Sequence, residues 1–210
     1  MSKKILLLTD SLALPRSHPE VCEYEDTWPN LLRKQGYFIH QVSIGGATTT
    51  DIVRQLHYHA PFSPDLVVLQ VGIVDCAPRF MTKVEQAIVR KIPLIANHIF
   101  SLMNRPFVKK VRKISYVRPQ RFSSNIQKII ETFGDTKIYF VGILPASEEY
   151  EKVLPGVSNR IYQYNKLAEQ QPLNLVSTDL FDLKGVMSDH HHLNKYGHKQ
   201  IFDYLLNSFG

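Results

Sequence analysis

The amino-acid sequence predicts a doubly wound α/β sandwich of three layers, in which helices cover both faces of a five-stranded parallel sheet. Two observations lead to this prediction. Short apolar segments of strand length alternate with longer segments of helical periodicity, the pattern of strand–helix–strand units. Residues 65–71 are apolar at nearly every position, as expected for a strand buried on both faces. The 210 residues suffice for a single domain, 1–210, and are too few for two ordinary ones.

The predicted strands are compact apolar runs, each ended by residues that suit a turn. They are residues 4–9, 37–43, 65–71, 137–144 and 173–177. In the predicted helices, apolar residues recur three to four positions apart. They are residues 27–35, 48–56, 81–103, 120–133, 157–170 and 194–209. Pro93 can break the third helix, and Asn194 can cap the last.

Basic residues are concentrated in one segment of the chain. The net charge is +6, yet residues 79–121 contain eleven basic residues and a single acid, Glu85. We expect this segment to form a basic helical insertion or lid near the strand ends, because one crossover helix would suffice there. Such an element can lie on an anionic membrane surface, bind a polyanionic substrate, or be a solvated face. No recognition motif accompanies the charge, so nucleic acid is not an expected partner.

Several other classes of protein do not fit the sequence. No apolar run reaches the roughly 18 to 20 residues that cross a bilayer, and the run after Lys3 and Lys4 is too short for a signal peptide. We therefore expect a cytoplasmic protein, with peripheral association with the inner membrane left open. Cys22 and Cys76 lack disulfide or metal-ligand spacing. Residues 190–192 are all histidine, but a metal would need further ligands, so neither metal nor cofactor is expected.

Residues that can carry chemistry gather where the predicted strands end. Ser11 follows the first strand, two glycines at 45–46 follow the second, and residues 72–75 follow the third. These strand ends meet at one edge of a parallel sheet, where ligands bind. A serine becomes a nucleophile only when a histidine takes its proton, and a carboxylate must orient that histidine. Asp189 and His192 have a spacing that suits this orientation within one turn.

Four segments, in this order, resemble the sequence blocks of the SGNH/GDSL hydrolase superfamily. They are Thr9-Asp10-Ser11-Leu12, Ile44-Gly45-Gly46-Ala47-Thr48-Thr49, Gly72-Ile73-Val74-Asp75 and Asp189-His190-His191-His192-Leu193-Asn194. The resemblance spans nearly the whole chain, although residues 80–136 match nothing specific. It implies a flavodoxin-like fold and a serine esterase or acyltransferase with the triad Ser11, His192 and Asp189. It also implies that the backbone N–H groups of Ser11 and Gly46 form the oxyanion hole.

The third block departs from the family pattern. The family usually has an asparagine there, whose side-chain amide is a further oxyanion donor, and aligning Gly72 and Asp75 places Val74 at that position. Valine cannot donate a hydrogen bond. The alternatives are a hole with two donors, a donor supplied by another segment, such as Asn97, and a site without activity.

Three further residues are candidates for substrate binding: Asp75, Arg79 and His191. The planar guanidinium of Arg79 suits a carboxylate or phosphate. Members with a third block like residues 72–79 resemble proteins of bacterial surface-polysaccharide biosynthesis, which implies an O-acylated carbohydrate or polysaccharide precursor as substrate. We expect hydrolysis of its ester. The alternatives are acyl transfer to a sugar hydroxyl by the same triad, and binding of a glycan or lipid-linked intermediate without catalysis.

Overall fold

A parallel sheet of five strands forms the centre of the molecule. The computed structural model describes residues 2–112 and 114–209. The sheet order is β2-β1-β3-β4-β5, so the predicted five-stranded parallel sheet is confirmed. The strands are β1 (Lys4–Thr9), β2 (Phe38–Ser43), β3 (Leu66–Gln70), β4 (Lys137–Val141) and β5 (Asn174–Val176).

The two central strands are buried along almost their whole length, because helices cover both sides of the sheet. In β1 the side chains of Leu6 and Leu7 are fully buried, as are those of Val67 and Val68 in β3. Leu7 pairs with Val68 on one side of β1 and with Gln41 of β2 on the other. Continuous apolar segments of this length are typical of strands buried on both faces, which explains why the sequence predicted them.

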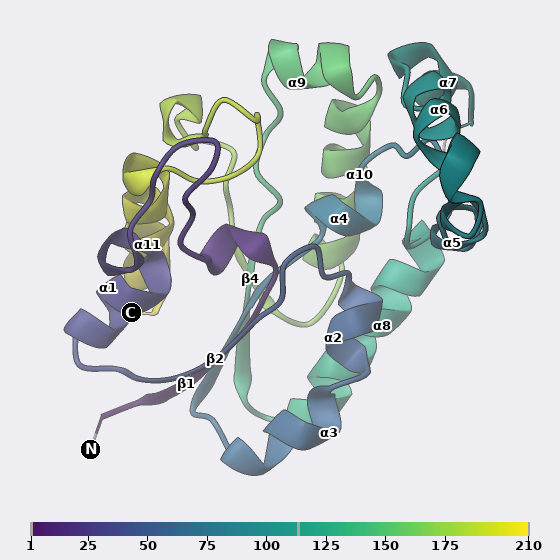
Figure 1. Cartoon of the computed structure of the whole chain (residues 1–210). Helices are drawn as coiled ribbons and strands as arrows, with labels where there is room; N and C mark the ends of the chain where they lie inside the picture. Colours follow the sequence, from purple (N-terminus) through teal and green to yellow (C-terminus); the bar gives the residue numbers. More distant parts are fainter. Residues whose placement is uncertain (1, 113, 210) are drawn as a thin grey trace.

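The helices form one layer on each face of the sheet (Figure 1). One layer contains α1 (Trp28–Lys34) and α11 (Lys195–Phe209), which pack against each other. The opposite layer contains α2 (Thr49–Val53), α8 (Pro119–Phe133) and α10 (Val157–Glu169). Several shorter helices complete the path of the chain. They are α3 (Leu56–His59), α4 (Ile73–Cys76), α9 (Glu148–Val153) and the 3₁₀ turns Ser11–Ala13, Tyr24–Asp26, Ala60–Phe62 and Leu183–Gly185.

Helix ends follow the capping residues in the sequence. Thr48 accepts a hydrogen bond from the backbone of Asp51, whose carboxylate accepts one from the backbone of Thr48, so this capping box fixes the start of α2. Asn194 accepts a hydrogen bond from the N–H of Gly197 at 3.1 Å and so caps α11, as expected. The helix expected over 48–56 is shorter, and the chain turns before α3 begins.

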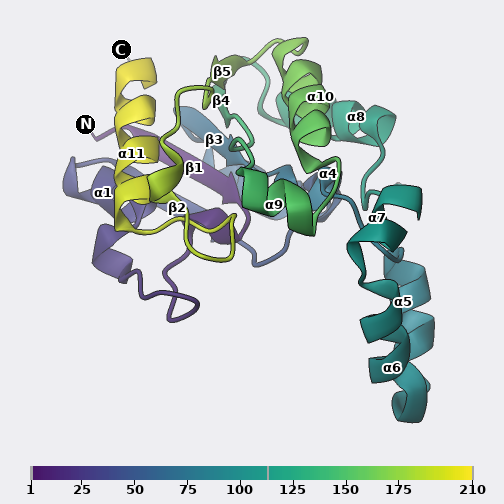
Figure 2. The same cartoon turned by 90° about the horizontal axis from the view of Figure 1, so that it is seen from above.

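Three helices from the basic segment project sideways from the sheet, as Figure 2 shows from above. They are α5 (Lys83–Arg90), α6 (Pro93–Met103) and α7 (Pro106–Arg112), and we call residues 83–112 the basic arm. The arm does not lie over the strand ends, as a lid would. Residue Lys113 and the side chains of Lys83, Pro93, Leu94 and Ile95 lie outside the described residues. α6 begins at Pro93, where the sequence allowed a break.

The root of the basic arm is closed by backbone pairing. The N–H of Arg79 donates to the carbonyl of Ile114 at 2.9 Å, so the two ends of the arm leave the body side by side. Farther along, Arg112 forms an ion pair with Glu85 at 2.6 Å, which joins α7 to α5. Within residues 2–112 and 114–209, we found no helix with the length and apolar character needed to span a bilayer.

Candidate active site

Ser11 stands at the carboxyl end of β1, in the first position of a 3₁₀ turn. The turn is held by Asp10, whose Oδ1 accepts a hydrogen bond from the N–H of Leu12 at 2.9 Å. Asp10 itself is fully buried, and its other carboxylate oxygen has no partner among the described residues. Burial raises the pKa of Asp10 to about 7. The carboxyl group thus shapes the turn, while the hydroxyl of Ser11 faces a cleft.

Ser11, His192 and Asp189 form a continuous chain of hydrogen bonds. The Oγ of Ser11 lies 2.9 Å from Nε2 of His192, and Nδ1 of the same ring lies 2.6 Å from Oδ2 of Asp189. Both distances fall in the range of about 2.6 to 3.2 Å that links a nucleophile, a base and its orienting group. The fold thus brings together three residues that the sequence analysis selected, although Ser11 and His192 lie 181 positions apart.

The loop that carries Asp189 and His192 is fixed at both ends. The N–H of Met187 donates to the carbonyl of His192 at 2.7 Å, which closes the loop on itself. The N–H of Asn194 donates to the carbonyl of Gly185 at 3.0 Å. Gly185 in turn packs against Gly197 of α11 so closely that a Cβ on Gly197 would overlap the Gly185 carbonyl oxygen. Helix α11 therefore positions the loop by direct backbone contact.

The electrostatic state of the His192–Asp189 pair suits proton transfer. Burial lowers the pKa of His192 to about 4, assisted by the neighbouring His191 and opposed by Asp189. Burial acts to raise the pKa of Asp189, but hydrogen bonds from the backbone and ring of His192 outweigh it and bring that pKa down to about 2. At neutral pH the imidazole is therefore uncharged beside an ionised carboxylate. The imidazole can therefore accept a proton, as a general base must.

Two backbone N–H groups beside Ser11 are available for an anion. Gly46 lines the same cleft and has a φ of +69°, in the left-handed region that favours glycine. In the described part of the chain, no hydrogen-bond acceptor pairs with the N–H of Ser11 or with that of Gly46. A Cβ at Gly46 would meet no atom within 4 Å, so the backbone conformation, not lack of space, calls for glycine there.

The cleft around Ser11 has a volume of about 610 Å³. The ring of His191 stacks on that of Tyr150, with centroids 5.9 Å apart. The guanidinium of Arg79 lies 4.7 Å from the ring centroid of Tyr116. Arg79 and His191, which the sequence predicts as candidates, both line the cleft. Arg16 also lines the cleft but was not predicted, because it stands in a loop with no distinctive pattern.

Asp75 differs from the sequence-based expectation, because it does not line the cleft. Its side chain is fully buried, and both carboxylate oxygens accept hydrogen bonds from the N–H of Thr49 at 3.1 Å. The hydroxyl of Thr49 donates to Asp75 as well, at 2.5 Å. Burial raises the pKa of Asp75 to about 7. Asp75 therefore ties α4 to the start of α2, behind the cleft wall.

Val74 occupies the place where the sequence pattern lacks its asparagine. It lies in α4 and lines the cleft. Asn97, the alternative donor considered from the sequence, is exposed on α6 in the basic arm and does not line the cleft. Among the described residues that line the cleft, no side chain carries a carboxamide.

Among the described residues, Asp189, His191 and His192 are the group that could hold a metal ion. Their ligand atoms lie within 4.8 Å of one another. An ion there would compete with the hydrogen bond between Nδ1 of His192 and Oδ2 of Asp189, because these atoms also serve as ligand atoms. These residues can therefore either bind a metal ion or hold His192 in the orientation of a base, but not both at once.

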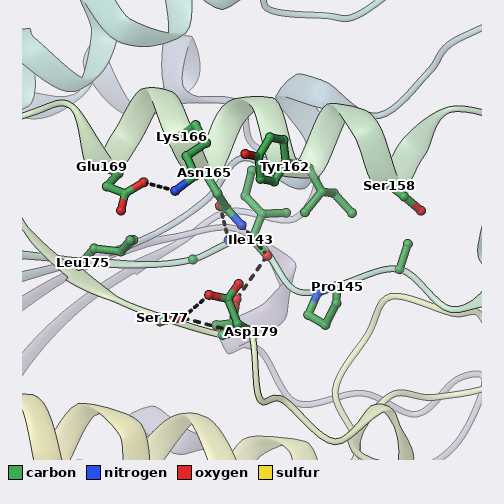
Figure 3. Close-up of a pocket in the computed structure, with 14 residues that line it drawn as sticks. Ile143, Pro145, Ser158, Tyr162, Asn165, Lys166, Glu169, Leu175, Ser177 and Asp179 are labelled. Carbon is green, nitrogen blue, oxygen red and sulfur yellow. Dashed lines mark hydrogen bonds and ion pairs between the residues drawn. The ribbon is translucent and has the colours of Figure 1, made fainter.

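A second pocket, of about 330 Å³, lies between α10 and the chain that leaves β4 and β5. Figure 3 shows that several of its polar side chains, Asn165 and Lys166 among them, are engaged with neighbouring groups. Asn165 accepts a hydrogen bond from the N–H of Ile143 at 2.8 Å and donates to its carbonyl at 3.0 Å. Lys166 forms an ion pair with Glu169 at 2.6 Å. None of Ser11, Asp189 and His192 lines this pocket, so the cleft is the stronger candidate for catalysis.

Comparison with known proteins identifies the family. A model of the GDSL-like Lipase/Acylhydrolase family matches residues 15–200. The chain belongs to the GDSL-like Lipase/Acylhydrolase family. This acylhydrolase is therefore an enzyme of the serine esterase type. The matched region includes Asp189 and His192 and begins shortly after Ser11. No match was found among curated proteins.

Solved structures share the fold of this GDSL-like acylhydrolase over nearly its whole length. A lipase/acylhydrolase from Enterococcus faecalis is 15% identical with a TM-score of 0.68, and the alignment covers 98% of this chain and 94% of that one. The esterase EstA from Pseudoalteromonas sp. is 15% identical with a TM-score of 0.61, covering 99% and 97%. An acetyl xylan esterase, AlAXEase, is 16% identical with a TM-score of 0.60, covering 97% and 98%.

Proposed function

We propose that this GDSL-like acylhydrolase cleaves O-acyl esters through a catalytic triad of Ser11, His192 and Asp189. The observation that carries the proposal is the unbroken hydrogen-bond chain from the Ser11 hydroxyl through the imidazole to the Asp189 carboxylate. A neutral His192 with an ionised Asp189 behind it can accept the Ser11 proton as the hydroxyl attacks.

The reaction divides into two half-reactions. In the first, Oγ of Ser11 attacks the ester carbonyl, its proton moves to Nε2 of His192, and the alcohol leaves with that proton, so that an acyl-serine remains. In the second, His192 takes a proton from water, the hydroxide attacks the acyl-serine, and the acid leaves as Ser11 regains its proton. In both, the N–H groups of Ser11 and Gly46 stabilise the negative charge on the former carbonyl oxygen.

We propose an acylated carbohydrate as the substrate class. The cleft offers aromatic surfaces at Tyr116 and Tyr150, the guanidinium of Arg79 and the imidazole of His191, a combination that suits a polar ring with hydroxyl groups. One similar structure is that of an acetyl xylan esterase. The resemblance of residues 72–79 to proteins of bacterial surface-polysaccharide biosynthesis extends the proposal to a polysaccharide precursor handled in the cytoplasm.

Acyl transfer to a sugar hydroxyl would use the same acyl-serine and differ only in the second half-reaction. The fate of the acetyl group of p-nitrophenyl acetate, followed with and without added sugars, separates the outcomes, because p-nitrophenol is released in the first half-reaction of both. We expect hydrolysis that does not need a sugar and yields acetate. Formation of an acetylated sugar in place of acetate would show transfer.

The triad assignment is tested by Ser11→Ala and by labelling with a fluorophosphonate, which reacts with activated serines. We expect Ser11→Ala and His192→Ala to abolish both labelling and esterase activity while circular dichroism shows an intact fold. Ser177→Ala is the matched control, because Ser177 is outside the cleft. Labelling of Ser11→Ala at the wild-type rate would disprove the assignment. Absence of labelling in the wild type would support a binding protein without catalysis.

A further inference from the structure

The basic arm exposes an unusual amount of apolar surface. Six of the fifteen large apolar side chains that are exposed in the described residues lie within residues 83–112. They are Val84, Ile88, Ile92, Leu102, Phe107 and Val111. Phe107 is 74% exposed and Val84 68%. Apolar side chains gathered in this way on a projecting element indicate a surface that is covered by something else.

These apolar residues follow the helical repeat. Val84 and Ile88 are four positions apart in α5, and Phe107 and Val111 are four positions apart in α7. Residues at this spacing lie on the same side of a helix. Each helix therefore presents an apolar strip, and neither strip packs into the core of the molecule.

The same arm carries an excess of positive charge. Arg90, Lys91, Arg105 and Lys110 are exposed, and none of the four forms an ion pair with another described residue. The one acid of the arm, Glu85, is neutralised by Arg112. Lys109 adds little to the outer surface, because it is buried and its ammonium donates to the carbonyl of Val153 at 3.4 Å.

We propose that the basic arm docks on an anionic lipid surface. Its exposed apolar side chains would enter the boundary between headgroups and acyl chains, while the arginines and lysines contact lipid phosphates. A soluble polyanion would pair with the cations but leave Phe107 and Val111 in water. A second copy of this chain would cover the apolar strips only by bringing like charges together. The combination of both features therefore favours lipid.

Docking of the basic arm would also determine how close the cleft lies to the membrane surface. The root of the arm joins the cleft wall, because Arg79 pairs with Ile114 and its guanidinium stacks on Tyr116. A docked arm would hold the cleft close to the membrane surface. Given the proposed esterase function, this favours substrates whose acylated sugar is attached to a lipid. The docking itself does not depend on that function.

The test is co-sedimentation of the full chain with vesicles of phosphatidylcholine alone and of phosphatidylcholine mixed with phosphatidylglycerol. We expect binding to the mixed vesicles only, and weaker binding as salt is raised. The variant Lys91→Glu/Lys110→Glu should lower the partition coefficient about tenfold or more. The variant Phe107→Ser/Val111→Ser should lower it as well, whereas Lys128→Glu and Leu180→Ser, at exposed sites outside the arm, should not.

Three results would overturn the proposal. One is equal binding to both kinds of vesicle, or to neither. Another is a protein that does not bind vesicles but binds soluble polyphosphate, with the same affinity in the wild type and in Phe107→Ser/Val111→Ser. The third is a dimer, seen by analytical ultracentrifugation, that these two substitutions dissociate. Hydrolysis of the soluble ester p-nitrophenyl acetate should be equal in all variants, so a failure of docking is distinguishable from a failure of the esterase proposal.

Discussion

Asp189 holds His192 at two points. Its Oδ2 lies 2.6 Å from the ring Nδ1, and its Oδ1 accepts a hydrogen bond from the backbone N–H of His192 at 3.0 Å. One carboxylate therefore fixes both the ring and the backbone that carries it. The orientation of the imidazole toward Ser11 depends on this double contact.

Asp189→Asn should remove this control. An asparagine amide can donate to Nδ1 and stabilise the wrong tautomer of His192, so we expect kcat to fall by roughly 10⁴-fold with little change in KM. Initial rates with p-nitrophenyl acetate measure the effect. Asp179→Asn, an exposed substitution outside the cleft, is the control. Wild-type kcat in Asp189→Asn would mean that Asp189 does not orient the base.

The pH profile should report the low pKa of His192. The base works only when neutral, so kcat/KM should fall as pH decreases through about 4, well below the ordinary histidine value of 6.5. Stopped assays after brief exposure to each pH, with residual activity checked at neutral pH, give the profile. His191→Gln should move the acidic limb upward, because His191 helps to lower that pKa. An acidic limb near 6.5 in the wild type would contradict the prediction.

Val74→Asn tests the oxyanion hole. Val74 lines the cleft where no carboxamide is present among the described residues, so a new amide there should add a donor and raise kcat modestly. The gain in transition-state stabilisation should not exceed the roughly 2.7 to 4 kcal/mol that such a donor contributes in other enzymes. We expect a smaller gain, because the residues around position 74 are not arranged to orient an amide toward the oxyanion. Rates of wild type and Val74→Asn are compared side by side, with Val74→Ala as control. A well-folded variant with tenfold lower activity would show that Val74 packs the site.

Arg79→Gln should weaken the binding of negatively charged esters more than that of neutral esters. The Nε of Arg79 is buried without a hydrogen-bond partner in the described part of the chain, and the guanidinium is held over Tyr116. We expect KM to rise roughly tenfold for esters with a nearby carboxylate or phosphate, the loss expected for a charge-assisted hydrogen bond. KM for a neutral ester should change little. An equal change in KM for charged and neutral esters would show that Arg79 has only a structural role.

Gly197→Ala should disturb the catalytic loop from a distance. The added methyl group would overlap the Gly185 carbonyl, forcing α11 and the loop apart at a cost of about 1 to 3 kcal/mol. We expect a lower Tm, measured by thermal unfolding, together with reduced kcat. Asn207→Ala, exposed on the same helix, should leave both unchanged. A Gly197→Ala variant with wild-type Tm would show that the contact can relax freely.

The sequence predicted the parts of the molecule that local pattern determines. The strands were predictable because segments such as 66–69 are apolar without interruption. Asp189 and His192 share one turn and Ser11 lies just after a strand, but it was the resemblance of their segments to the family's sequence blocks that made all three predictable. The family assignment implied by these residues is confirmed.

Features that depend on tertiary contacts were not predictable. Asp75 sits two positions from the cleft residue Ile73, but the short helix α4 turns its carboxylate inward to Thr49. A helix of four residues has too little periodicity to reveal which side chain faces inward. Arg16 reaches the cleft from a loop, and α7 lies in a segment whose charges obscure its repeat.

The closed root of the basic arm has a consequence for how such proteins diverge. Because Arg79 and Ile114 are hydrogen-bonded neighbours, the chain between them leaves and rejoins the body at one point. Its length can therefore change with little entropic penalty, since loop closure grows only slowly with length, and the pairing of β3 with β4 need not shift. Insertions between these two residues can therefore differ among related proteins without moving the residues of the cleft. This is the position at which a new targeting segment could be grafted.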